Sequence, residues 1–271
     1  MHDSLRFAET LRTPTTHLPI PRPIRLAPAM TALCADAKNA SALAPRPCQH
    51  CSAQHSCPVT RIDADQVVQL QLKEHRFLAG DVLQAQGSTT TAIRIIKSGV
   101  TMMRRESRHG KRQSIGMLGR GTVIGSFGLL GRANPVTHIG ILEGRYCELP
   151  IAAMRRRGLL EDPVFLGHMS GAMAQAFESH FNWCQLSHCT GVARQLAGAL
   201  LHLSDLQNSL RVRLPNQTTL AELLGTTRES ITRAFARLEK EGDVSRSGRY
   251  HCDLDVPRLE RTIKAMNPPA Q

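Results

Sequence analysis

The sequence predicts an α+β protein in which a small β-barrel or jelly roll precedes a long helix and a C-terminal domain of short helices. Between residues 64 and 150, short apolar runs alternate with glycines at intervals that suit the turns of a small barrel. After Pro163 glycines become rare, and apolar side chains recur at helical spacing. A chain of 271 residues is long enough for two modest domains and a tail.

The apolar runs of the β-region are its predicted strands, and they are Val67–Leu72, Ala92–Ile96, Val100–Met103, Ile115–Met117, Thr122–Ile124 and Ile139–Leu142. Six prolines lie in residues 1–46, so we expect a flexible N-terminal arm there. We divide the rest into a cysteine-containing loop and β-barrel at 47–163, a long helix at 164–188, a helical domain at 189–262 and a tail at 263–271.

The predicted long helix carries one apolar stripe. At about 100° per residue, one face holds Leu166, Met169, Met173, Ala176, Phe177, His180 and Cys184. Glu178 lies on the opposite side. Such a stripe either packs on its own domain or forms the seam of a dimer, and periodicity leaves both possibilities open.

The composition favours a polyanionic partner. Lys and Arg number 34 against 22 Asp and Glu, a formal net charge of +12, which suits nucleic acid but also a simple solvated basic surface. The sequence lacks an apolar run of membrane-spanning length and a signal-peptide pattern, so we expect a cytoplasmic protein that has no membrane partner. Eight cysteines in that reducing compartment indicate metal or redox chemistry. No enzyme motif is recognisable, and no enzymatic activity is expected.

Residues 217–242 have the pattern of two helices joined by a tight turn. A short helix is predicted at Leu220–Leu224 and is followed by Gly225. Thr226 then opens a second helix, with Glu229 three positions later as in a capping box. Two helices joined in this way form a helix-turn-helix.

The second helix divides into two faces. One face is apolar and consists of Ile231, Ala234, Phe235 and Leu238; the other is polar and consists of Arg228, Glu229, Thr232 and Arg233. Arginine can donate two hydrogen bonds to guanine, and glutamate can accept one from the cytosine amino group. Residues 244–250 resemble a wing hairpin in which Arg246 and Arg249 would meet phosphates. A helical hairpin with an ordinary charged surface is the alternative.

Three cysteines form a compact motif before the β-region. Cys48, Cys51 and Cys57 have the spacing C-x2-C-x5-C, which lets three thiolates surround one metal centre. The fourth ligand could be Cys34, Cys147, Cys184, Cys189, Cys252, His50 or His55. Spacing alone does not distinguish an iron–sulfur cluster from zinc or from unbound cysteines.

The chain as a whole resembles the CRP/FNR superfamily of bacterial regulators over residues 46–262, and most closely its oxygen-sensing branch, the fumarate and nitrate reduction regulators. The motifs that carry the resemblance are CQHCSAQHSC, FLAGDVLQAQG, RYCELP and TTLAELLGTTRESITRAFARLEKEG. It implies a cyclic-nucleotide-binding-like β-barrel, a long dimerisation helix and a winged helix-turn-helix. It also implies a 4Fe-4S cluster on Cys48, Cys51, Cys57 and Cys147, the last within Cys-Glu-Leu-Pro.

The resemblance further implies a homodimer that binds palindromic promoter DNA during anaerobic growth, with RNA polymerase as a partner and activation as its role. The helix residues implied in dimerisation are Met169, Met173, Ala176, Phe177 and His180. A regulator that senses thiol oxidation or zinc through the same cysteines is the alternative.

The sequence departs from the superfamily pattern in several places, three of which bear on ligand binding and regulation. The glutamate and arginine that hold a cyclic nucleotide are replaced by Ser126 and by Pro135-Val136, so we expect no cyclic nucleotide. Ser56 is polar where the oxygen sensor has an apolar residue, which predicts a different sensitivity of the cluster. Ala176 replaces an acidic residue that opposes dimerisation, which predicts easier dimerisation of the apo protein.

Overall fold

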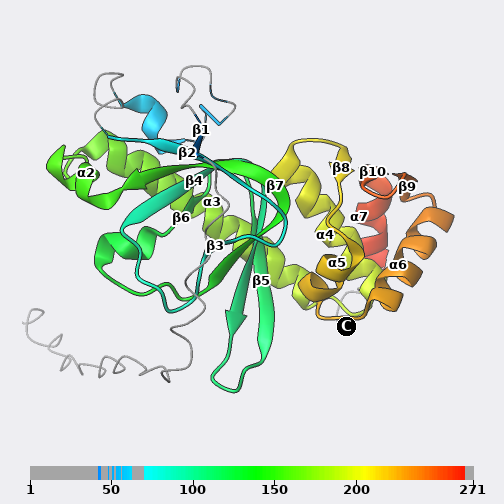
Figure 1. The fold of residues 1–271 in the computed structure, drawn as a ribbon. Coiled ribbons are helices and arrows are strands. Elements are labelled where there is room, and N and C mark those ends of the chain that lie inside the picture. The colour runs from blue at the N-terminus through cyan, green and yellow to red at the C-terminus, as the bar shows by residue number, and fades with distance from the viewer. Residues whose placement is uncertain are drawn as a thin grey trace, which may run out of the picture. The chain divides into compact units, whose positions relative to one another are not determined.

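The computed structural model describes residues 42–43, 48, 51, 53–55, 57–62 and 70–265, which belong to one compact unit. An antiparallel β-domain leads through a long helix into a C-terminal domain of short helices and a small sheet (Figure 1). The predicted α+β class is therefore confirmed. No helix among the described residues is long and apolar enough to cross a membrane.

The β-domain is an antiparallel sheet with the strand order β1-β2-β7-β4-β5, to which β3 adds on β7 and β6 on β4. The strands are β1 (Ala42–Leu43), β2 (Lys73–Phe77), β3 (Val82–Gln84), β4 (Ala92–Glu106), β5 (Arg112–Leu118), β6 (Val123–Ile124) and β7 (Thr137–Pro150). The 3-10 helices η3 (Pro58–Arg61) and η4 (Ser126–Leu130) accompany the strands.

Two predictions for the N-terminal half need correction. The strand expected at Val67–Leu72 is wrong over its described residues, 70–72. Leu70 and Gln71 form a turn in which Gln71 has a φ of 54°. Residues 67–69 lie outside the described residues. β1 lies within the segment expected to be a flexible arm, and it pairs with β2 through Ala42 and His75. The other residues before Cys48 lie outside the description.

The long central strands β4 and β7 cross very closely at two glycines. A side chain on Gly99, whose φ is +85°, would come within 2.7 Å of the Glu143 carbonyl oxygen. Gly144 faces the backbone of Ser98 even more tightly. The register of the two strands shifts on both sides of Ser98. Lys97, just before this irregularity, lies on the same face of β4 as Ile93 and Ile95 by ordinary strand alternation, and it is buried.

Helix α3 (Pro163–Ser187) links the two halves of the molecule, and α2 (Ile151–Arg156) precedes it. Asp162 caps α3, since its carboxylate accepts hydrogen bonds from the backbone N–H groups of Val164 (2.8 Å) and Phe165 (3.2 Å). Phe165 is buried in the core of the β-domain, whereas Trp183 joins the core that the C-terminal domain shares with β4, β5 and β7.

The C-terminal domain has a helical core closed by a three-stranded sheet of order β8-β10-β9. Its elements are α4 (Val192–Gln207), β8 (Arg211–Arg213), α5 (Gln217–Leu224), α6 (Arg228–Lys240), β9 (Val244–Ser247), β10 (His251–Leu254) and α7 (Val256–Ala265). Helix α7 continues beyond residue 262, where the domain was predicted to end. Residues 266–271 of the predicted tail lie outside the described residues.

Candidate nucleic-acid interface and cysteine site

Helices α5 and α6 form the predicted helix-turn-helix, with two boundaries moved. Helix α5 begins at Gln217, three residues before the prediction, because the Asn216 side chain caps it by accepting from Thr219 N–H at 2.8 Å. The N-cap of α6 is Thr227, whose hydroxyl accepts from Ser230 N–H at 3.2 Å, and not Thr226 as predicted.

The predicted division of α6 into two faces is confirmed by burial. The four apolar residues are buried in the core, and the polar residues Arg228, Glu229, Thr232 and Arg233 are exposed. Hydrogen bonds to the carboxylate from its own backbone N–H and from the Thr227 hydroxyl hold the pKa of Glu229 below its usual value. Glu229 is therefore an anionic acceptor at neutral pH, as pairing with a cytosine amino group requires.

The wing hairpin is formed by β9 and β10, and its two predicted phosphate contacts differ in their surroundings. Arg246 donates two hydrogen bonds to the carboxylate of Glu239, at 2.8 and 2.6 Å, and its guanidinium lies 5.0 Å from the centre of the Phe235 ring. Arg249 lies at the exposed turn, 5.6 Å from the Tyr250 ring. Arg246 thus faces its own domain, and its contact with phosphate stays a prediction.

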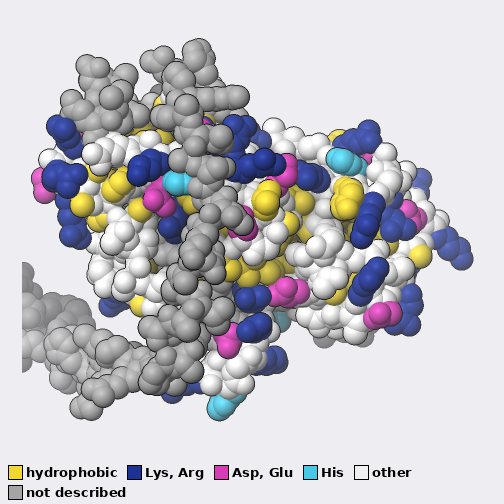
Figure 2. Space-filling model, in the orientation of Figure 1, with side chains coloured by type: hydrophobic (Ala, Val, Ile, Leu, Met, Phe, Trp, Pro, Cys, Tyr) yellow, Lys and Arg dark blue, Asp and Glu magenta, His cyan; other side chains and the backbone are white. Residues whose placement is uncertain are grey.

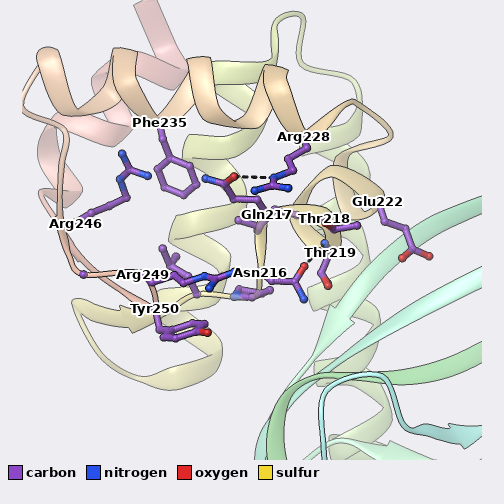
Figure 3. A pocket seen from close by; sticks show the side chains of 14 residues that line it. Asn216, Gln217, Thr218, Thr219, Glu222, Arg228, Phe235, Arg246, Arg249 and Tyr250 are labelled. Carbon is purple, nitrogen blue, oxygen red and sulfur yellow. Dashed lines mark hydrogen bonds between the residues drawn. The ribbon is translucent and has the colours of Figure 1, made fainter.

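A groove of about 520 Å³ lies between the start of α5, helix α6 and the wing. Figure 3 shows Gln217 and Arg228 on one side of this groove and Arg249 and Tyr250 on the other. Lys and Arg side chains are spread over both halves of the visible face of the molecule (Figure 2). Net charge alone therefore does not locate the interface, and the helix-turn-helix geometry does.

The described cysteines of the predicted site come from one loop and one strand. Cys48 and Cys51 lie in a turn closed by a hydrogen bond from Cys51 N–H to Cys48 O at 3.1 Å, and Cys57 immediately precedes η3. Cys147 lies in β7, with Glu74 opposite it on β2 and Ile95 opposite it on β4. Both Cys51 and Cys147 are buried.

The four thiols influence one another electrostatically. Burial raises the pKa of Cys147 to about 12, and the charges of Cys57 and Cys51 act in the same direction, whereas Lys97 opposes them. Burial likewise raises the pKa of Cys57 to about 11, with Cys48 and Cys51 contributing. The pKa of Cys147 in β7 is thus raised in part by Cys51 and Cys57 of the loop.

A buried ion pair lies beside these cysteines. Lys97 Nζ is 2.7 Å from Glu74 Oε2, and Arg145 approaches the other carboxylate oxygen at 3.3 Å. Sequence reasoning missed this pair, because Lys97 interrupts an apolar strand without any motif around it. Within the part of the chain that the structure describes, no three His, Cys, Asp or Glu side chains are placed to hold a single metal ion.

The alternative ligands are dispersed. Cys252 is buried in β10 of the C-terminal domain, Cys184 and Cys189 lie near the end of α3, and His55 is exposed. Cys34, His50 and the polar neighbour Ser56 lie outside the described residues.

The residues expected to mediate dimerisation do not all face outward. Met173 and Phe177 do, with 39% and 57% of their surface exposed. Met169 is only 4% exposed and packs in the core of its own β-domain, which corrects its assignment to a dimer contact. His180 Nδ1 lies 2.7 Å from the Ile115 carbonyl oxygen, and Ala176 is half-buried.

Two exposed apolar residues of α3 extend the outward stripe. Phe181 is 61% exposed and was not predicted, although its place one turn after Phe177 would have identified it. Leu166 is also exposed and continues the same line toward the start of the helix.

Comparison with known proteins agrees with this geometry. Residues 74–157 match the cyclic nucleotide-binding domain family, and residues 194–262 match the Crp-like helix-turn-helix domain family. The transcriptional activator protein FnrL of Cereibacter sphaeroides is 21% identical over 229 residues, which cover 78% of this chain and 90% of that protein.

Several solved structures share the fold. FixK2 from Bradyrhizobium japonicum has a TM-score of 0.61 at 17% identity, covering 74% of this chain and 100% of its own. A CRP-family transcriptional regulator from Thermus thermophilus has a TM-score of 0.58 at 20% identity, covering 72% of this chain and 99% of its own. With a β-domain and a DNA-binding domain that each match a family in this arrangement, the chain belongs to the CRP/FNR superfamily of transcription regulators.

Proposed function

We propose that this regulator is a homodimeric, oxygen-responsive activator that holds a 4Fe-4S cluster on Cys48, Cys51, Cys57 and Cys147 and binds palindromic promoter DNA. The observation that carries the sensing part is the hydrophobic core beneath the cysteine loop. Cys48 and Cys57 pack against the same buried cluster that contains Phe165 of α3. What orders the loop therefore also bears on the helix that leads to the DNA-binding domain.

The donor set fits an iron–sulfur cluster. The loop supplies Cys48, Cys51 and Cys57 and strand β7 supplies Cys147, all of them at least partly buried, and cysteine thiolates are the usual ligands of such clusters. Ala53 N–H lies 3.4 Å from Cys51 Sγ, a backbone donor that would stabilise a bound thiolate. The buried ammonium of Lys97 would offset part of the negative charge that four thiolates bring. A bound cluster would link the cysteine loop to the β-sheet, and its binding free energy would be lost when oxygen destroys it.

Helix α3 offers a path from the cysteine site to DNA. Its first half contributes Met169 to the core under the cysteine loop, and its second half contributes Trp183 to the core shared with the DNA-binding domain. The exposed side chains of Met173, Phe177 and Phe181 lie on the remaining face and suit the same face of a second copy. An ordered loop would hold α3 in the position that favours this pairing.

In the dimer, two α6 helices would enter successive major grooves of a palindrome, about one helical turn apart. Arg228 and Arg233 would donate to guanines and Glu229 would accept from a cytosine amino group, while Arg249 would contact phosphate. The FnrL relative is named a transcriptional activator, which supports activation, and we propose RNA polymerase as the partner in that role. Ser126 lacks the carboxylate that would hold a ribose, and Pro135 and Val136 lack the positive charge that would hold a cyclic phosphate, which supports the absence of a cyclic nucleotide.

The sensing proposal is tested by anaerobic purification followed by absorbance, iron and sulfide analysis. We expect iron and sulfide in equal amounts, lost on exposure to air, and lost from the Cys147→Ser variant in the absence of air. Cys184→Ser is the matched control and should keep the cluster. If the purified protein contains only zinc, or no metal and thiols that form disulfides in air, the proposal of a cluster is contradicted. Either result would support the alternative, a sensor of zinc or of thiol oxidation.

The DNA-binding proposal is tested with Arg233→Ala in a binding assay on a selected palindrome and on unrelated DNA. The variant should lose the preference for the palindrome while keeping its weak affinity for any duplex. Lys240→Ala, at the far end of the same helix, is the control. Specific binding that survives Arg233→Ala would contradict the assignment of α6. RNA polymerase contact is tested by transcription in vitro from a promoter that contains the palindrome.

A further inference from the structure

Gln217, the first residue of α5, reaches across to the base-reading face of α6 (Figure 3). Its Oε1 lies 3.4 Å from Arg228 Nε, which donates to it, and 3.3 Å from Thr232 Oγ1. One amide oxygen from the first helix therefore contacts two of the four polar side chains on the exposed face of the second.

The contact with Arg228 is the more directional of the two. The Thr232 hydroxyl has a single proton, and its oxygen also lies 3.0 Å from the Arg228 carbonyl oxygen, so the two acceptors compete for that proton. A bond to Arg228 Nε orients the plane of the guanidinium and leaves donors on both terminal nitrogens for a guanine edge.

The amide is presented from a rigid position. Asn216 caps the helix at its first turn, and Leu220 and Ala221 on the same helix are buried in the core. Gln217 itself is half-buried and lines the 520 Å³ groove. The Gln217 side chain is therefore more restricted than an exposed side chain such as that of Arg228 would be without a partner.

We infer that Gln217 is a positioning residue for base recognition, which holds Arg228 in its reading conformation before DNA arrives and so sharpens sequence discrimination without contacting a base. A side chain that is ordered beforehand loses less conformational entropy when it binds. The inference rests on the proposed reading of bases by Arg228.

The experiment compares Gln217→Met and Gln217→Glu with wild type on the selected palindrome and on its single-base variants. Methionine keeps the size but removes the acceptor, so discrimination at the base pair read by Arg228 should fall about fivefold, part of what a bidentate contact provides. The dependence of affinity on salt should not change, because no phosphate contact is lost. Glutamate keeps an acceptor oxygen, so it should keep discrimination while its charge weakens binding to all sequences equally.

The Arg228→Ala background separates a positioning role from other roles. There, Gln217→Met should cause no further loss of discrimination, because Gln217 acts through Arg228. Further loss in that background would overturn the inference in favour of direct reading by Gln217. Equal weakening on all sites together with a lower melting temperature would overturn it in favour of a structural role.

The failure of the proposed function has a different signature. If Arg228→Ala alone keeps full discrimination, Arg228 does not read a base, and the inference falls with that part of the proposed function. If Arg228→Ala loses discrimination but Gln217→Met does not, only the positioning inference is overturned.

Discussion

Acid should destabilise this protein through His138, a neutral histidine in the interior of the β-domain. His138 lies in β7 between Gln84 of β3 and Met103 of β4, and it is only 6% exposed. Among the described residues its Nδ1 has no hydrogen-bond partner. Burial, assisted by the positive charge of Arg94, lowers the pKa of His138 to about 4.

The sign and size follow from proton linkage. In the unfolded chain His138 has its ordinary pKa of 6.5, so below that pH the unfolded state binds the proton and the folded state does not. Stability therefore falls as the pH drops below about 6.5 and levels off below about 4. The full loss is about 3 kcal/mol, and about 2 kcal/mol of it is reached at pH 5.

The assay is urea unfolding of the reduced apo protein at pH 7.5 and pH 5.0, for wild type and for His138→Gln. The variant removes the titrating group, so wild type should lose about 2 kcal/mol more than the variant between the two pH values. Burial also lowers the pKa of His202, but that effect is common to both proteins and cancels. If the difference in stability between the two proteins is the same at both pH values, the assignment of His138 as a buried neutral base is refuted.

Three further perturbations follow from the structure. Phe181→Glu should shift the cluster-loaded protein toward monomer in sedimentation with little change in melting temperature, and an unchanged dimer would remove α3 from the interface. Lys97→Met should lower the free energy of unfolding in urea by about 3 kcal/mol, because it leaves the carboxylate of Glu74 buried with one partner fewer. Lys97→Arg is the control, and equal stability of the two variants would contradict this reasoning. Glu239→Gln should release Arg246 toward DNA, raising affinity for all sequences and steepening the salt dependence by about one charge, and an unchanged slope would mean that Arg246 stays on its own domain.

The helix-turn-helix was predictable because its signals are local. The 3.6-residue period separated the buried Phe235 from the exposed Arg233, since every residue of a helix points in a direction set by its position. The N-cap was misplaced by one residue because two threonines stand side by side. Thr226 N–H bonds to the Ala221 carbonyl and completes the end of α5, so Thr227 is the residue that caps α6.

The cysteine site was predictable only in part. The spacing of Cys48, Cys51 and Cys57 is local, but Cys147 was selected by resemblance, because contact between a loop and a strand far along the chain has no signature in spacing. Sheet pairing brings Glu74 opposite Cys147, and strand alternation turns Lys97 to the same face of β4 as Ile95, which also lies opposite Cys147. The charge environment of the thiols is therefore a property of tertiary structure.

Helix α3 shows most clearly where local pattern ends. Its sequence alone determined a long helix with an apolar stripe, because periodicity fixes which side chains share a face. Which part of that stripe is buried depended on the surfaces that pack against it. The β-domain covers Met169, β5 engages His180, and Met173, Phe177 and Phe181 are left exposed. Packing against residues distant in sequence separated the core of the subunit from the surface on which a partner can bind.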